Sequence, residues 1–201
     1  MDMTKLTRHS HRRDRPGLTL LGRFGLAGAR AHELCGTARR RLALWLAAEV
    51  EGPVLWIRPG WHPDRLHMAG VRAEIDPGRL IFVEPERPAD LLWTMEEALR
   101  AGVLPLVVCD LPEPPGLTPV RRLHLAAEAG GGSGPGLMLT PGEGGAAGVE
   151  SRWRLEPAHG AEETGWRLAR LRARDAPPGD WGVTRGAKGR PVLVETAAEP
   201  A

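Results

Sequence analysis

The chain contains no tyrosine, only two phenylalanines and two cysteines, and only two lysines among its 27 basic residues. Cys35 and Cys109 are the only two cysteines of a 201-residue chain and lie far apart in it. This low number excludes a disulfide-stapled scaffold and favours a reducing, cytoplasmic compartment. No apolar run approaches the roughly 18 residues that a membrane helix needs, so we expect no membrane partner.

The net charge of +2 predicts no strong general attraction to nucleic acid. The near-complete use of arginine for basic positions is typical of GC-rich coding, so an arginine cluster carries little information by itself. Residues 1–16 are densely basic and hold almost nothing to bury, which predicts a disordered basic tail. An arm that contacts DNA or a partner is the alternative interpretation.

Short apolar runs alternate with amphipathic segments up to residue 140. The runs are continuous, as expected of strands covered on both faces, and the segments between them have helical periodicity. This alternation predicts an α/β fold with a mostly parallel sheet flanked by helices. The expected strands are 31–35, 54–57, 80–83, 104–109 and 137–140, and the expected helices are 40–50, 88–100 and a third that Thr118 caps and Gly130 closes.

The pattern changes after residue 140. A glycine-rich loop, 141–148, precedes two segments, 151–156 and 166–174, in which large apolar and basic residues alternate. They predict an antiparallel hairpin appended to the parallel sheet, ended by the Pro-Pro-Gly sequence at 177–179. One more short strand is expected at 192–195. The predicted organisation is therefore a tail (1–16), one domain (17–183) and a C-terminal extension (184–201).

The first apolar strand ends at Gly36, where a fold of this class would carry a phosphate-binding loop. That loop requires a second glycine, then a lysine and a hydroxyl residue, and these positions hold Arg41, Leu42 and Ala43. A bulky arginine in place of glycine would crowd the phosphates, although a nearby arginine is able to replace the charge of the lysine. We therefore interpret this segment as a structural turn and predict no cofactor.

Several motifs occur in a characteristic order: His-Glu-Leu-Cys-Gly at 32–36, Pro-Ala-Asp-Leu-Leu-Trp at 88–93, Pro-Leu-Val-Val-Cys-Asp at 105–110, Leu-Pro-Glu-Pro-Pro-Gly-Leu-Thr at 111–118, Ser-Arg-Trp-Arg-Leu at 151–155 and Trp-Arg-Leu at 166–168. Of these, the motifs at 32–36 and 105–110 resemble the core of the RecA recombinase, and the other four resemble the ImuA family more closely. From about residue 22 to residue 183, the chain is similar to the ImuA family of RecA-like, SulA-related proteins that act in bacterial damage-induced mutagenesis.

The resemblance implies a non-catalytic adaptor of SOS-induced translesion DNA synthesis. Such a protein docks an ImuB-like homologue of the Y-family polymerases and, through it, a DnaE-type polymerase; RecA and single-stranded DNA are further candidate partners. A SulA-like inhibitor of cell division and a weakly DNA-binding RecA paralogue are the alternatives.

The resemblance also identifies what is missing from a RecA-like ATPase site. The place of the catalytic glutamate holds Arg-Pro-Gly-Trp at 58–61, which contains no carboxylate. Asp110 matches the acid that ends the fourth strand, but without the lysine it has little to coordinate, so we expect it to cap a helix or turn. We therefore predict that the protein is not an enzyme.

Two surfaces are candidates for binding. Arg170, Arg172 and Arg174 are predicted to project from one face of a strand beside Trp153 and Trp166, a mixture that suits phosphate contact and base stacking. A solvated edge hairpin with two core tryptophans is the alternative.

The second surface is the C-terminal stretch, which is predicted to join the sheet edge of a partner through Trp181, Val192, Leu193 and Val194. The histidines show no spacing typical of a metal site, and no metal is predicted.

Overall fold

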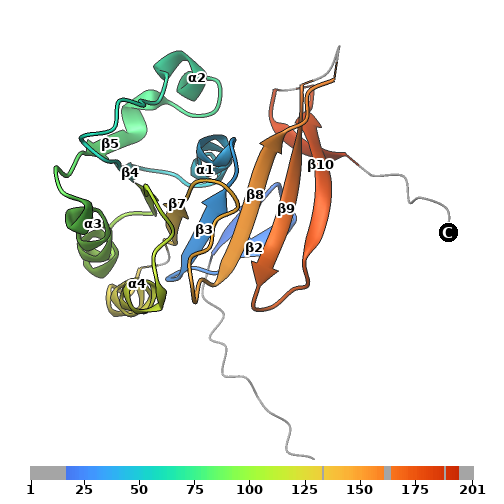
Figure 1. Cartoon of the computed structure of the whole chain (residues 1–201). Coiled ribbons are helices and arrows are strands. Elements are labelled where there is room, and N and C mark those ends of the chain that lie inside the picture. The colour runs from blue at the N-terminus through green and yellow to red at the C-terminus, as the bar shows by residue number, and fades with distance from the viewer. Residues whose placement is uncertain (1–16, 133, 161–163, 188, 195–201) are drawn as a thin grey trace, which may run out of the picture.

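The computed structural model describes residues 17–132, 134–160, 164–187 and 189–194, and the predicted tail at 1–16 lies outside these ranges. Its centre is a nine-stranded sheet in the order β11-β10-β9-β8-β3-β7-β6-β4-β5 (Figure 1). Neighbouring strands are parallel from β5 to β8 and antiparallel from β8 to β11. The predicted α/β class and mostly parallel sheet are confirmed. The strands are β3 (Ala31–Cys35), β4 (Val54–Ile57), β5 (Leu80–Val83), β6 (Leu106–Asp110), β7 (Gly136–Leu139), β8 (Ser151–Pro157), β9 (Gly165–Ala173), β10 (Gly179–Arg185) and β11 (Pro191–Val194).

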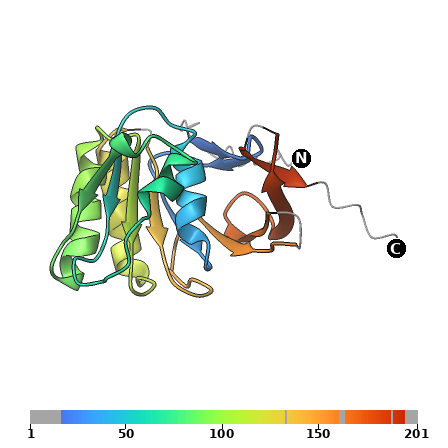
Figure 2. The same ribbon diagram turned by 90° about the horizontal axis from the view of Figure 1, so that it is seen from above.

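Two apolar cores lie on opposite faces of this sheet. One contains the buried sides of α3 (Pro88–Ala101) and α4 (Leu117–Ala129), which lie side by side in Figure 1. The other contains α1 (Arg39–Ala47) and a small hairpin formed by β1 (Leu18–Leu20) and β2 (Phe24–Leu26). Figure 2 shows this hairpin, in blue, beside the C-terminal strands. The segment between β4 and β5 contributes α2 (Met68–Arg72) and a 3₁₀ turn (Pro77–Arg79).

Local sequence explains where the helices begin and end. Pro88 opens α3, and Gly102, with a φ of 66°, closes it in the left-handed conformation that glycine adopts without a steric penalty. The prediction that Thr118 caps α4 is wrong, because the cap residue is Gly116 and no side chain caps the helix. The helix starts at Leu117, two residues earlier than predicted, because a proline, here Pro119, is tolerated within the first turn.

The antiparallel part of the sheet is larger than the predicted hairpin. The predicted pair, β8 and β9, is confirmed, but the prediction that the unit ends at residue 179 is wrong, since β10 begins at Gly179. The expected boundary after residue 183 lies inside β10, and β11 pairs with β10. Small and polar residues such as Gly182 hide the apolar alternation of β10 in the sequence. The hairpin of β1 and β2 also escaped prediction, because three-residue strands give too short a pattern.

Candidate functional site

The turn after β3 is where a phosphate would bind in a nucleotide-binding α/β protein. Gly36 has a φ of +87°, and the main-chain N–H of Thr37 donates to both carboxylate oxygens of Glu156 at 3.2 Å. The Thr37 hydroxyl also donates to Glu156. The N–H of Ala38 donates to the carbonyl of Leu155 at 3.1 Å. The protein's own carboxylate therefore occupies the anion-binding donors at the start of α1.

The positions that differ from the phosphate-loop pattern have structural roles. Leu42 and Ala43 are fully buried in the core beneath the sheet. Arg41 donates to Glu74 at 2.7 Å, a carboxylate that it shares with Arg185 of β10. None of these side chains is placed to hold a phosphate above Gly36.

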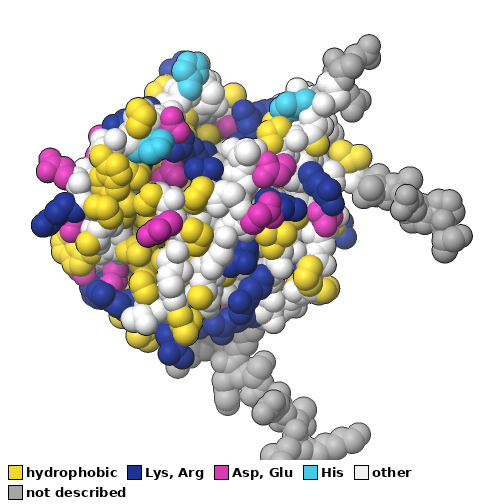
Figure 3. Space-filling view, in the orientation of Figure 1, with side chains coloured by type: hydrophobic (Ala, Val, Ile, Leu, Met, Phe, Trp, Pro, Cys, Tyr) yellow, Lys and Arg dark blue, Asp and Glu magenta, His cyan; other side chains and the backbone are white. Residues whose placement is uncertain are grey.

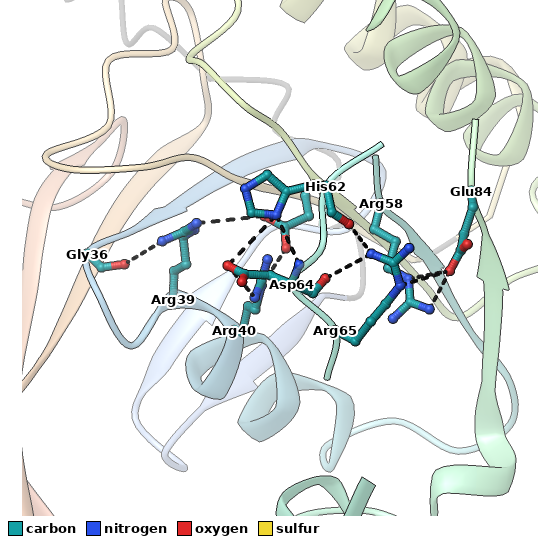
Figure 4. A network of polar contacts seen from close by, with 9 residues as sticks. Gly36, Arg39, Arg40, Arg58, His62, Asp64, Arg65 and Glu84 are labelled. Carbon is teal, nitrogen blue, oxygen red and sulfur yellow. Dashed lines mark hydrogen bonds and ion pairs between the residues drawn. The ribbon is translucent and has the colours of Figure 1, made fainter. Parts of the chain in front are cut away.

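Asp110, at the carboxyl end of β6, binds arginines. Its Oδ2 lies 2.5 Å from Nε of Arg40, and its Oδ1 lies 3.9 Å from Arg39. Arg40 also faces Asp64 at 3.8 Å, in the network that Figure 4 shows beside Gly36. The prediction that Asp110 caps a helix or turn is wrong, because its buried carboxylate instead pairs with two guanidinium groups from α1. Both oxygens of the Asp110 carboxylate thus face arginine side chains.

The place of the catalytic glutamate holds another arginine. Arg58 follows β4, donates to Glu84 at 2.7 Å and stacks over the ring of Phe82 at 4.3 Å. Arg65 contacts the same carboxylate at 3.6 Å (Figure 4). Ion pairs within the protein therefore occupy this carboxyl end of the sheet. The side-chain hydrogen bond from Arg58 lowers the pKa of Glu84.

The glycine-rich loop at 141–148 is organised by Glu33, a fully buried carboxylate in the middle of β3. It accepts hydrogen bonds from Thr140 Oγ1 at 2.6 Å, from the N–H groups of Gly145 and Ala146 at 2.8 and 3.0 Å, and from Arg152 Nε at 2.5 Å. Sequence reasoning missed this residue, although a glutamate inside an apolar strand run is a usable signal. The glycine-rich loop is therefore tied to the core through Glu33.

The predicted DNA-binding arginines do not share one face. The register pairs Arg170 with Trp153 and Arg172 with Arg152, with an irregularity between these pairs. Since residues 152 and 153 point to opposite faces of β8, their partners do too. The prediction of one arginine face is wrong because the extra residue at this bulge reverses the alternation of β9.

Arg170 is instead part of an aromatic cluster. Its guanidinium lies over the rings of Phe24, Trp153 and Trp181 at 5.9, 5.5 and 5.2 Å, and its Nε donates to the carbonyl of Pro177 at 2.7 Å. Trp166, the other tryptophan of the predicted surface, is also buried. This cluster joins the hairpin of β1 and β2 to the antiparallel strands.

The remaining basic side chains on these strands are mixed with acidic ones. Arg174 lies 3.4 Å from Glu150, and Arg167 lies 3.0 Å from Asp180. Figure 3 shows basic and acidic side chains interspersed over this part of the molecule. Arg172 is exposed. The arrangement favours a balanced surface over a continuous positive groove.

The predicted partner-binding residues separate into two groups. Trp181 packs 4.4 Å from the ring of Phe24, and Leu193 packs against the core. Val192 and Val194 point the other way and are 42% and 44% exposed. The outward surface of edge strand β11 thus consists of the two valines.

Two buried polar or nucleophilic groups invite a catalytic interpretation. His32 Nδ1 lies 2.7 Å from Ser151 Oγ, which also accepts a hydrogen bond from the Trp153 indole. Both residues are buried, and burial lowers the pKa of His32 to about 4, so the pair is a structural hydrogen-bond chain.

Burial likewise raises the pKa of Cys35 to about 12 and raises that of Cys109. Both are free buried thiols, and β7 separates their strands.

Among the described residues, the histidine, cysteine and carboxylate side chains form no group of three that is able to hold a metal ion. In the same ranges, no helix has the length and apolar character needed to cross a membrane.

These features define an α/β domain in which the turn after the first parallel strand is filled by the domain's own side chains. No family model matches the sequence. The chain is 30% identical over 186 residues to the protein ImuA of Caulobacter vibrioides, in both strain NA1000 / CB15N and strain ATCC 19089 / CIP 103742 / CB 15. Each alignment covers 82% of this chain and 75% of the relative. The chain belongs to the ImuA family.

Proposed function

We propose that this protein is a non-catalytic adaptor in SOS-induced translesion DNA synthesis and mutagenesis. Membership of the ImuA family supports a role in the damage response. The observation that carries the proposal is the occupation of the nucleotide position by internal partners, Glu156 on the Thr37 N–H and Arg40 on Asp110. A domain of this class retains its surfaces when its nucleotide chemistry is lost, and an adaptor needs surfaces.

The proposal predicts no ATP turnover above background in the purified protein. The lysine position is the buried Leu42, and Asp110 is paired with Arg40. A coupled phosphate-release assay on the wild type and on Asp110→Ala measures this. Turnover that Asp110→Ala abolishes would identify a residual enzyme and defeat the proposal.

The partner that we propose is an ImuB-like homologue of the Y-family polymerases, which links the adaptor to a DnaE-type polymerase. The supporting surface is β11, which among the described strands pairs only with β10 and presents Val192 and Val194 outward. An edge strand offers unpaired N–H and C=O groups to a partner strand, and exposed valines add apolar contact.

Substitution of this edge tests the partner assignment. Val192→Lys with Val194→Lys is expected to weaken co-purification with the ImuB-like protein at least tenfold, because charged side chains oppose edge pairing. Val103→Lys is the matched control, since Val103 is 78% exposed at the end of α3 and far along the chain from β11. Equal retention of the partner by both variants would place the docking surface elsewhere.

We further propose that single-stranded DNA is bound weakly at most and in a salt-sensitive manner, through Arg172, Arg174 and residues 1–16. The packing of the half-buried Arg170 against aromatic rings removes it from this set. Fluorescence anisotropy across a salt series checks the proposal. Tight binding that persists at moderate salt in an Arg172→Gln and Arg174→Gln variant would contradict it.

A further inference from the structure

A cavity of about 470 Å³ lies between the start of α1 and the antiparallel strands. Its lining includes Thr37 and Arg41 from the α1 side and His159, Trp166 and Arg185 from the antiparallel part. These strands lie on the β8 side of β3, whereas Asp110 lies on β6 beyond β7, so the cavity is separate from the position of a RecA-like magnesium site. Its volume is within the range of sites that hold small organic ligands.

The charge of this cavity comes from two guanidinium groups that share one carboxylate. Arg41 and Arg185 both bind Glu74, whose side chain is only 4% exposed. Both also lie over the ring of Trp166, at 5.2 and 5.7 Å. Within this trio two positive charges face one buried negative charge, and a second carboxylate, Glu156, lies nearby on Thr37. The stacking holds both guanidinium planes in place, and Arg41 retains N–H donors beyond the one that Glu74 accepts.

We propose that this cavity binds the phosphate group of a phosphate monoester through Arg41 and Arg185. Guanidinium groups match phosphate oxygens in geometry, and two of them from separate elements suit a dianion better than a singly charged carboxylate. The rings of His159 and Trp166, 5.5 Å apart at the same cavity, offer a wall for a planar group of the ligand. A free nucleotide and the 5′-phosphate end of a nucleic acid share this chemistry.

Glu156 restricts the site in the resting structure. It holds the N–H and the hydroxyl of Thr37, two donors at the cavity wall and at the positive end of α1. A ligand phosphate therefore competes with this carboxylate for Thr37. Removal of the Glu156 charge makes these donors available and reduces repulsion of the ligand.

Isothermal titration calorimetry on the full chain tests the site with four probes: inorganic phosphate, a nucleoside monophosphate, a 5′-phosphorylated oligonucleotide and the same oligonucleotide without its phosphate. The phosphorylated probes are expected to bind saturably, and loss of the phosphate is expected to weaken oligonucleotide binding at least tenfold. Tighter binding of the monophosphate would identify a free nucleotide as the source of the phosphate, and tighter binding of the oligonucleotide would identify a nucleic-acid end.

Three variants locate the binding. Arg185→Gln is expected to weaken it about tenfold, the scale of one charged hydrogen bond, whereas Glu156→Gln is expected to strengthen it severalfold. Arg121→Gln, at an exposed position of α4, is the control and is expected to bind like the wild type.

The proposal is overturned if no phosphorylated probe binds saturably, or if Arg185→Gln keeps its circular-dichroism spectrum and the wild-type affinity. If Arg185→Gln fails to fold, Glu156→Gln decides: unchanged affinity in that variant would also overturn the proposal.

Discussion

At the scale of single residues, two carboxylates, Glu33 and Glu156, bind partners that are distant in sequence. Glu33 binds Arg152, and Thr37 binds Glu156, each pair being 119 residues apart. Such pairs cannot be inferred from local patterns, because no spacing rule links residues that meet only after the sheet has formed. The sequence shows that the phosphate-loop lysine is absent, because Leu42 stands at its position. It does not show that the carboxylate of Glu156 binds the loop.

Glu33→Gln tests the buried carboxylate. The substitution leaves Arg152 without its ionic partner and places the amide N–H₂ of glutamine beside the N–H donors that the carboxylate now accepts from. The free energy of unfolding is therefore expected to fall by about 3 kcal/mol. Chemical denaturation measures this change. Glu143→Gln is the control, because Glu143 pairs with Arg154 at a position that is largely exposed. Equal stability of the two variants would show that Glu33 does not organise the loop.

His32 predicts a pH dependence of stability. Burial holds its pKa at about 4 in the folded state, against 6.5 for the free side chain. The unfolded chain therefore binds a proton between these values, and the free energy of unfolding falls as the pH drops from about 6.5 to 4, by up to about 3 kcal/mol. The contribution is fully present above pH 6.5, and the lowered pKa of His124 acts in the same direction.

Urea unfolding at a series of pH values measures this effect. His32→Gln is expected to flatten the dependence, whereas His67→Gln, at an exposed position, is expected to leave it unchanged. An unaltered slope in His32→Gln would contradict the assignment.

At the scale of elements, the parallel strands were predictable because each is a continuous apolar run, as in Val54–Ile57 and Ala31–Cys35. Prediction failed for β10, where Gly179 and Gly182 interrupt the apolar pattern, and for the arginines of β9. There a bulge shifts the alternation, so Arg170 faces the aromatic cluster and Arg172 faces the other way. A local irregularity of one residue is enough to reassign every side chain beyond it.

Arg170→Ala tests this reassignment. Loss of the stacked guanidinium and its packing is expected to lower the free energy of unfolding by about 1–2 kcal/mol, whereas Arg172→Ala is expected to change it by less than about 0.5 kcal/mol. Thermal or urea unfolding of both variants measures the difference. A larger effect of Arg172→Ala would contradict the observed register.

At the scale of the whole molecule, the antiparallel strands β8 to β11 extend a parallel sheet, and Glu156 of β8 binds Thr37 in the turn after the first parallel strand. The Arg41–Glu74–Arg185 ion pairs connect α1, the segment after α2 and β10. The proposed adaptor thus offers the edge of β11 to a partner, on a domain that is held together by internal salt bridges and aromatic packing.

The frequency of damage-induced mutation in living cells tests the central claim most directly, when two chromosomal variants are compared. The paired substitution Asp110→Asn with Arg40→Gln removes the Asp110–Arg40 ion pair by replacing both charged groups with amides. We expect it to keep induced mutagenesis at the wild-type level, while Val192→Lys with Val194→Lys reduces it to the level of a deletion. Loss of mutagenesis in the first variant and its retention in the second, with both proteins present at wild-type abundance, would contradict the account.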